Sequence, residues 1–421
     1  MTSATPAPRQ LVSRLQWIVL GLLVVSVCIN YIDRGNLSVA SVAISKELGL
    51  RPSQLGVLFS GFFWTYAGFM IFAGWLIDRY NVVWVYAIGY LMWSAATAVT
   101  GLVTGFTALF ALRLVLGMSE SVAYPSYSKI IAADFPERQR GMANGLLDAG
   151  SKLGPALGLM FGGTILDHYG WRALFLSIGL VSLLWLVPWC LIAPKVPRAA
   201  PQGSKSGPGF LEIMEKQDAW GTFLCLFGAN YGWYFLLTWL PGYLQMERHY
   251  STQTMALVGS LPFWAVSAGA VFGGWASDRW IAQGGGTTLV RKTFVITGLT
   301  GCAFFLLPAA IALNQVVAMS LLVTASFSFG LFSSNHWAIS QTLAGPAAAG
   351  KWTGLQNCSG NLAGVVAPVV TGFVVESTGS FFFAFVFVCG FMLISALSYL
   401  LNVQKNEPTK WRSSSIIPTL P

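Results

Sequence analysis

Long apolar runs separated by short polar segments dominate this chain. An α-helix needs about 20 apolar residues to cross the hydrocarbon core of a bilayer, and most of these runs are at least that long. The pattern predicts an all-α membrane protein with twelve transmembrane helices. The predicted spans are 16–43, 54–77, 82–103, 106–133, 140–166, 171–193, 218–245, 254–276, 290–313, 315–343, 351–376 and 379–402.

One long polar stretch, 194–216, divides these spans into two sets of six, and its Pro, Gly and Ser content cannot bury a core. We expect an N-terminal six-helix bundle (1–193), a cytoplasmic linker (194–216) and a C-terminal six-helix bundle with a cytoplasmic tail (217–421). Internal repeats support this division. GWLIDR at 74–79 recurs as GWASDR at 274–279, and Gly163 to Gly170 is echoed by Gly372 to Gly379. Two pseudo-symmetric bundles predict a working site between them, near the bilayer midplane.

Composition and charge exclude several classes of protein. Only 9% of the 421 residues are charged, against roughly 25% in soluble proteins, so the lipid bilayer is the expected environment. The net charge of +9 does not indicate a nucleic-acid partner, because the basic residues lie mostly in short loops. Of the 24 Lys and Arg, 17 fall on the side that carries both termini and four on the other, which predicts a multi-pass protein with both termini cytoplasmic.

The sequence carries no pattern typical of an enzyme or a metal site. The six cysteines form no CxxC pair, and no histidine has a second ligand at metal-binding spacing. No arrangement of Ser, His and Asp indicates hydrolysis. We therefore expect neither enzymatic activity, nor a cofactor, nor a bound metal.

Six residues of the types Asp, Glu, Lys and Arg fall within predicted spans away from their ends, and all of them lie in the first half of the chain. Each costs several kcal/mol in hydrocarbon unless it faces water or a partner, so together they mark a polar path. They are Asp33, Arg34, Arg113, Glu120, Asp148 and Lys152. The interior polar residues of the second half are neutral, and they include Tyr231, Tyr234, Ser334, Asn335, Trp337 and Asn357. We infer that the first half binds charge and the second half recognises hydroxyl groups.

This charge set can couple a proton to an anion. Three cations face three carboxylates, so protonation of one carboxylate leaves a net positive site that attracts an anion. Arginine does not lose its proton under working conditions, so the carboxylates must carry it. Glu120 is the first candidate and Asp33 the second. Arg34 and Arg113 would be counter-charges, and Arg113 could also bind a substrate carboxylate through two parallel hydrogen bonds.

Several motifs together resemble a known family across nearly the whole chain. They are NYIDRGNLS at 30–38, RLVLGMSESVAYPSY at 113–127, FPERQRGMANG at 135–145 and NYGWYFLLTWLPGYL at 230–244. With these motifs the chain resembles the anion:cation symporter branch of the major facilitator superfamily, whose members carry organic anions such as sugar acids, usually with protons. The GWLIDR and GWASDR segments resemble that superfamily's loop signature. Here Tyr80, Asn81 and Val82 replace the usual glycine and basic tail, so we expect a weaker or differently built inner latch.

The resemblance also implies roles for individual residues. Glu120 and Asp33 match proton-coupling positions of the family. Tyr66 matches a binding tyrosine, Trp337 and Asn357 match contact positions, and Lys152 lies on a span that supplies a substrate contact. The full predicted substrate-binding set is Arg34, Arg113, Tyr66, Lys152, Tyr231, Tyr234, Ser334, Asn335, Trp337 and Asn357. The predicted gating residues are Asp78, Arg79, Asp278 and Arg279.

Each of these roles has a structural alternative. Glu120 with Arg113, and Asp33 with Arg34, could be static ion pairs that hold helices together. Asp148 and Lys152 are four residues apart, a spacing that favours pairing along one helix. The aromatic residues could simply pack.

The sequence predicts a secondary active transporter that imports an organic anion with protons by alternating access. A passive facilitator or an anion exchanger for small carboxylates is the alternative. Sugar acids, small dicarboxylates and aromatic carboxylates would all suit the site. We expect a monomer in a bacterial inner membrane.

Overall fold

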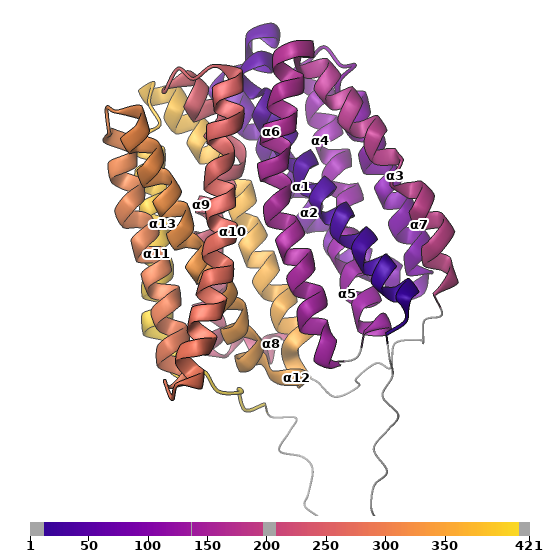
Figure 1. Ribbon diagram of the computed structural model, residues 1–421, viewed down its shortest axis with the longest axis vertical. Helices are drawn as coiled ribbons and strands as arrows, with labels where there is room; N and C mark the ends of the chain where they lie inside the picture. The colour runs from indigo at the N-terminus through magenta and orange to yellow at the C-terminus, as the bar shows by residue number, and fades with distance from the viewer. Residues whose placement is uncertain (1–11, 136, 197–207, 412–421) are drawn as a thin grey trace, which may run out of the picture.

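The computed structural model describes residues 12–135, 137–196 and 208–411, without the side chains at 71, 78, 137, 138, 141, 346, 347 and 349. Helices account for nearly all of the described chain (Figure 1). They are α1 (Arg14–Leu48), α2 (Pro52–Arg79), α3 (Val82–Thr100), α4 (Phe106–Glu120), α5 (Ala123–Asp134), α6 (Glu137–Leu183), α7 (Leu186–Ile192), the 3-10 helix η1 (Ala193–Lys195), α8 (Phe210–Met214), α9 (Gln217–Met246), α10 (Thr252–Ala282), α11 (Thr287–Ile311), α12 (Gln315–Thr378) and α13 (Phe382–Asn402).

These helices form the twelve predicted spans. Within the described residues, ten helical stretches are long and apolar enough to cross a membrane. Two of them are the parts of α12, which breaks at Gly345, where the backbone has φ 60° and ψ 176°. Another is the joined stretch Met142–Lys195, which breaks at Gly170 and so counts as two spans. With α2, which is not among the ten, the described residues contain twelve spans. The predicted all-α fold is therefore confirmed.

Local sequence signals explain where the spans begin and end. Helix α1 extends beyond the predicted 16–43 at both ends. At its start, the Ser13 and Gln16 side chains each bond the other residue's backbone N–H, which satisfies two free donors of the first turn. At its end, Gly49 adopts a left-handed conformation with φ 63°, which glycine tolerates because it has no Cβ.

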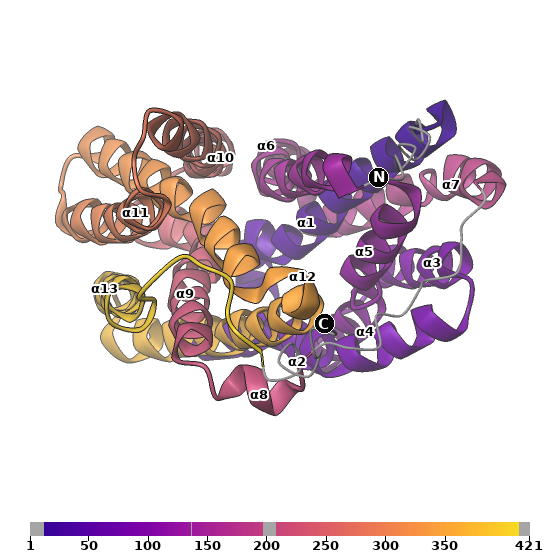
Figure 2. The same cartoon turned by 90° about the horizontal axis from the view of Figure 1, so that it is seen from below.

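The helices group into two halves, as the view from below shows, with α1 to α7 on one side and α9 to α13 on the other (Figure 2). The division of the chain at 194–216 stays a prediction, because 197–207 lie outside the described residues. On either side of that gap, η1 ends at Lys195 and α8 precedes α9.

The repeated glycines lie where the two halves meet. Gly170 and Gly379 end the fifth and eleventh spans, both with positive φ (80° and 69°). Seven residues earlier, Gly163 lies against Ala256 of α10, and a Cβ at Gly372 would come within 2.6 Å of the Pro52 carbonyl oxygen of α2. The repeat therefore places a small residue at two of the helix pairs that join the halves, α6 with α10 and α2 with α12.

The two halves are joined at the end of the molecule away from the start of α1 and the end of α13, which we call the closed end (Figure 1). There the Glu376 carboxylate accepts hydrogen bonds from the Ser53 backbone N–H at 3.0 Å and from Arg51 at 3.4 Å. The Ser38 hydroxyl donates to the Thr238 carbonyl oxygen at 2.6 Å. These contacts hold the two halves together at that end.

The first prediction concerns this closed end. A Cβ at Gly56 of α2 would lie 2.5 Å from the Pro368 carbonyl oxygen of α12, whereas Gly68 on the same helix has no atom within 4 Å of that position. We expect Gly56→Ala to weaken closure and to lower transport several-fold, and Gly68→Ala to do neither, although both replacements raise helix propensity. The readout is thiol labelling of Ser60→Cys, a buried site on α2 whose hydroxyl donates to Val365. Equal labelling rates with either alanine would contradict a role for this contact.

Candidate functional site

A buried ion pair joins α1 to α4 in the middle of the first half. Arg34 Nε lies 2.9 Å from Glu120 Oε2, and the two side chains are 3% and 0% exposed. Close packing of α4 against α2 supports it. Gly117, one turn before Glu120, has room for no side chain, because a Cβ there would lie 2.5 Å from Thr65 Oγ1. The structure therefore pairs Glu120 with Arg34, and not with Arg113 on its own helix.

Three aromatic rings surround the Arg34 guanidinium. Its Cζ lies 4.8 Å from the ring centroid of Tyr31, 4.9 Å from that of Phe62 and 4.5 Å from that of Tyr66. Such contacts stabilise a cation electrostatically, and more strongly when water is excluded. Arg34 is thus held by rings and by Glu120 together, and Tyr66, a predicted binding residue, belongs to its immediate surroundings.

Asp33 and Arg113 are two further buried charges close to this ion pair. They are 1% and 5% exposed, and Asp33 directly precedes Arg34 on α1. One carboxylate oxygen of Asp33 accepts from the Asn36 amide at 3.3 Å, and the other has no partner among the described residues. The Arg113 guanidinium lies 5.5 Å from the centroid of the Phe62 ring, which Arg34 also contacts. Asp33 and Arg113 therefore keep hydrogen-bonding capacity that the described residues do not use.

Buried polar atoms without partners gather around these four residues. Among the described side chains they include Asn30 Nδ2, Asp33 Oδ2, Arg34 Nη2, Asn36 Oδ1, Arg113 Nε and Glu120 Oε1. A buried polar group left unpaired costs about 1–3 kcal/mol, and more when it is charged. Such a concentration within a membrane span is typical of a site that receives a ligand or a proton.

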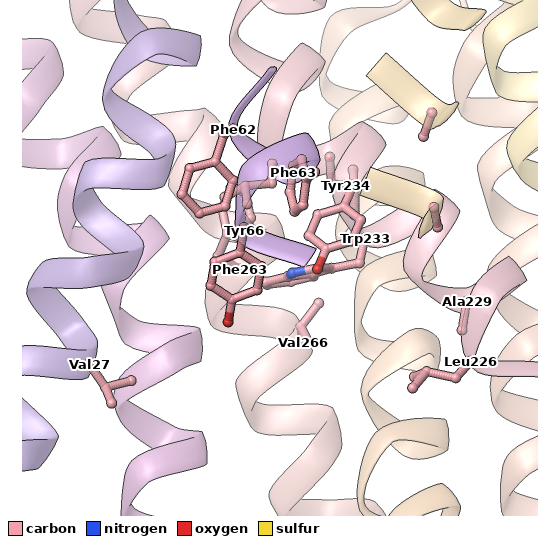
Figure 3. Packing of buried hydrophobic residues seen from close by; sticks show 14 of the residues in the cluster. Val27, Phe62, Phe63, Tyr66, Leu226, Ala229, Trp233, Tyr234, Phe263 and Val266 are labelled. Carbon is pink, nitrogen blue, oxygen red and sulfur yellow. The ribbon is translucent and has the colours of Figure 1, made fainter. Parts of the chain in front are cut away.

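The second half faces this site with a tyrosine and an amide. Tyr234 of α9 donates its hydroxyl to Asn361 Oδ1 at 2.9 Å, and its ring lies 4.4 Å from that of Phe63 on α2. Figure 3 shows Phe63 and Tyr66 of α2 beside Trp233 and Tyr234 of α9. The Tyr66 ring in turn lies 4.5 Å from the Arg34 guanidinium. The structure therefore brings a predicted hydroxyl-binding residue of the second half up to the charges of the first.

Lys152 of α6 also reaches across to the second half. Its Nζ lies 3.3 Å from Asp148 Oδ1 on its own helix and 5.1 Å from the ring centroid of Trp233 on α9. The Lys152 side chain is 17% exposed and that of Asp148 is 49% exposed. The helical pairing of these two residues is present, in a more open setting than the Arg34 ion pair.

Three predicted binding residues lie inside the second half and do not meet this group. The Tyr231 ring stacks on Phe391 of α13 with a centroid distance of 4.2 Å. Asn335 is fully buried and accepts from Arg291 at 2.9 Å. Ser334 lies beside Gly274 of α10. Their contacts are those of residues that hold α9 to α13 together.

Trp337 and Asn357, both half-buried on α12, complete the predicted set. The Trp337 ring lies 5.5 Å from that of His336, and the Asn357 carbonyl oxygen accepts from the Asn361 amide at 2.9 Å. Asn357 thus lies one helical turn from the partner of Tyr234, so it belongs to the same side of the second half.

Three of the four predicted gating residues have described side chains, and these contact residues of their own half. Asp278 pairs with Arg291 at 2.6 Å. Arg79 and Arg279 are exposed, and each lies 5.8 Å from the ring of a tryptophan on its own helix, Trp75 and Trp275. The side chain of Asp78 lies outside the described residues. The gating role of these four positions stays a prediction.

Sequence reasoning left Tyr31, Trp233 and Asn361 out of the predicted binding set. Tyr31 precedes Arg34 by three residues, a spacing that puts both on one helix face, so its sequence position could have identified it. Trp233 carried no such signal, because its partner Lys152 belongs to the other half. Across the described residues, no group of three or more His, Cys, Asp or Glu could hold a metal ion.

Comparison with known proteins decides the family. The family model described as Major Facilitator Superfamily matches residues 23–368. The chain belongs to the major facilitator superfamily. It is a membrane transporter and not an enzyme, as the sequence predicted.

Relatives of known name agree with this membership. The "Probable galactarate/D-glucarate transporter" of Bacillus subtilis is 30% identical over 95% of this chain and 94% of its own length. The "D-galactonate transporter" of an Escherichia coli strain is 29% identical over 93% of this chain and 96% of its own. These names confirm the resemblance to the organic-anion branch of the superfamily.

A solved structure supports the fold. The crystal structure of a bacterial homolog to the human lysosomal transporter Spinster, in an inward-facing and occupied conformation, superposes with a TM-score of 0.81. The two chains are 18% identical over 93% of this chain and 97% of the other, so the similarity concerns the fold alone.

The second prediction concerns the stability of the ion pair. Removing one partner of a buried pair leaves the other charge uncompensated and costs about 3–5 kcal/mol, whereas an exposed pair on one helix contributes less than about 1 kcal/mol. We therefore expect Glu120→Ala to lower the thermal unfolding midpoint of the purified protein far more than Asp148→Ala. Restoration of that midpoint by the added change Arg34→Met would support the pairing. Equal shifts for the two alanine variants would contradict it.

Proposed function

We propose that this transporter imports an organic anion, a sugar acid or a related carboxylate, in symport with protons by alternating access. The observation that carries the proposal is the buried Arg34–Glu120 ion pair with Asp33 and Arg113 buried close to it, because all four side chains retain unpaired polar atoms. The names of the relatives support the substrate class, because galactarate, D-glucarate and D-galactonate are sugar acids. The protein would act as a monomer in a bacterial inner membrane, with both termini cytoplasmic.

Arg113 is the cation best suited to bind a carboxylate of the substrate. Arg34 already donates to Glu120 and is packed among rings, whereas the Nε–H of Arg113 has no acceptor among the described residues. A planar guanidinium binds a carboxylate through two parallel hydrogen bonds. Tyr234 and Asn361 would contact the hydroxyl groups of the same substrate from the second half.

Glu120 would carry the coupled proton, with Asp33 as the second candidate. While Glu120 is charged, it neutralises Arg34 at 2.9 Å. Protonation of Glu120 removes that compensation and leaves the site with an excess positive charge, so an anion binds more strongly. By the reciprocity of binding free energies, a bound anion equally favours the protonated acid.

Alternation would follow from the substrate touching both halves. The closed end is held by small-residue contacts and a few hydrogen bonds, such as that from Ser38 to Thr238. A substrate held between Arg113 and Tyr234 would draw the opposite end together. Two rigid halves that rock around a central site are the general solution for transporters built from repeats.

A passive facilitator or an exchanger for small carboxylates is the competing function. All three mechanisms need the same anion site, so the relatives' substrates do not discriminate between them. They differ in whether an imposed pH gradient drives accumulation of the substrate above its external concentration in sealed vesicles.

The third prediction is that Glu120→Gln abolishes proton-driven accumulation and leaves exchange of substrate measurable. Glutamine imitates the protonated acid and cannot release a proton, but exchange requires no release. The measurement is uptake of labelled sugar acid into proteoliposomes, with an inward proton gradient in one series and with internal unlabelled substrate in the other. Accumulation at the wild-type level would remove Glu120 from the coupling mechanism.

The fourth prediction tests how Arg113 binds. Lysine keeps the charge but lacks the planar guanidinium that binds a carboxylate through two hydrogen bonds. Arg113→Lys should therefore lower the affinity for the substrate by roughly tenfold or more. Substrate affinity is read from competition with labelled sugar acid. Near-normal affinity in the lysine variant would mean that Arg113 acts only as a general counter-charge.

A further inference from the structure

A third cation lies apart from the central ion pair, at the boundary between the halves. Lys152 belongs to α6, but its Nζ is 5.1 Å from the ring of Trp233 on α9. An ion pair that merely stabilises α6 would need only Asp148, its neighbour on that helix. The contact with the other half instead places Lys152 beside the space that a substrate held between the halves would occupy.

One aromatic side chain lies between Arg34 and the helix that carries Lys152. The ring of Tyr31 lies 4.8 Å from the Arg34 guanidinium, and a Cβ at Gly154 of α6, two residues after Lys152, would lie 2.6 Å from the Tyr31 Cβ. The Tyr31 hydroxyl lies 3.2 Å from that of Tyr124, and neither side chain is fully buried. Arg113 belongs with Arg34, because their guanidinium groups lie 5.5 and 4.9 Å from the centroid of the same Phe62 ring. The site therefore has positive charge at the two arginines and at Lys152, with the two tyrosines beside them.

The present partner of Lys152 can be displaced. Asp148 is 49% exposed and lies 3.3 Å from Lys152, and an ion pair of this spacing on a solvent-accessible helix surface is weak. Lysine is a compact charge on a flexible stem with three donors, so it can turn from Asp148 to another anion. Arg34 has no such freedom, because Glu120 and three rings hold it.

We propose that the substrate is a dianion, with one acidic group at Arg113 and the second at Lys152. This inference rests on the proposed function and narrows its substrate class to short dicarboxylates. In the aldaric acids among them, hydroxyl-bearing carbons separate the two carboxylates. The tyrosines between the cations would contact the hydroxyl groups of that middle section. A substrate with a single acidic group would leave Lys152 paired with Asp148 and would bind more weakly.

Two pairs of acids that differ at one terminus test the proposal. Galactarate and D-galactonate differ by a carboxylate in place of a hydroxymethyl group, as do succinate and 4-hydroxybutanoate. Dissociation constants are measured by calorimetry on the purified full-length protein. In at least one pair the wild type should bind the diacid roughly 10- to 100-fold more tightly, because a charge-assisted contact is gained.

Variants of Lys152 and its neighbours test whether Lys152 causes the difference in affinity between diacid and monoacid. Lys152→Gln should reduce the diacid-to-monoacid affinity ratio to within about threefold, whereas Lys152→Arg should keep most of it. Asp148→Asn removes the competing carboxylate and should raise the ratio. Lys46→Gln, an equal charge change at an exposed residue of the closed end, should leave the ratio unchanged.

The outcomes separate this proposal from the proposed function. Equal affinities of diacid and monoacid for the wild type in both pairs would overturn the dianion assignment and leave organic-anion transport intact. If Lys152→Gln weakened both acids equally, Lys152 would be a contact between the halves and not a subsite. Failure of every acid to bind would overturn both proposals.

Discussion

The cost of charge in hydrocarbon is the constraint on which this structure depends. Arg34 and Glu120 can be buried only as partners, and their 2.9 Å contact requires α1, α2 and α4 to pack closely. Gly117 permits that packing, and the rings of α1 and α2 surround the guanidinium that the packing encloses. Because the same pair leaves Glu120 Oε1 and Arg34 Nη2 without partners, it is stable yet responsive to a proton or an anion.

The two halves share a fold but divide its chemistry. The Asp, Glu, Lys and Arg residues predicted away from the ends of spans all belong to the first half, and the second half contributes Tyr234 and Asn361. Charge is costly to bury, so placing it in one half leaves the other free to adjust to neutral hydroxyl groups. The proposed coupling therefore requires the halves to meet around the substrate.

Close backbone contact holds those halves together at one end. Glycines on α2, α6 and α12 admit the neighbouring helix where a larger residue would collide with it, and few polar bonds cross the interface there. Contacts of this kind depend on complementary shape, and few charged groups lose a partner when they separate. They suit an interface that must open and close in every cycle, because a strong buried ion pair there would resist opening.

The sequence by itself determined the all-α fold, the twelve spans and the candidate charges, because hydrophobic runs and buried ionisable residues are local signals. The repeated glycines were also visible, although not their contacts. Only the tertiary structure decided that Glu120 meets Arg34 and not Arg113, since partners 86 residues apart are chosen by helix packing. It likewise set Tyr231 and Asn335 inside the second half and Trp233 beside Lys152. Helical periodicity shows that a residue faces protein, but the neighbour it faces depends on how all the helices pack.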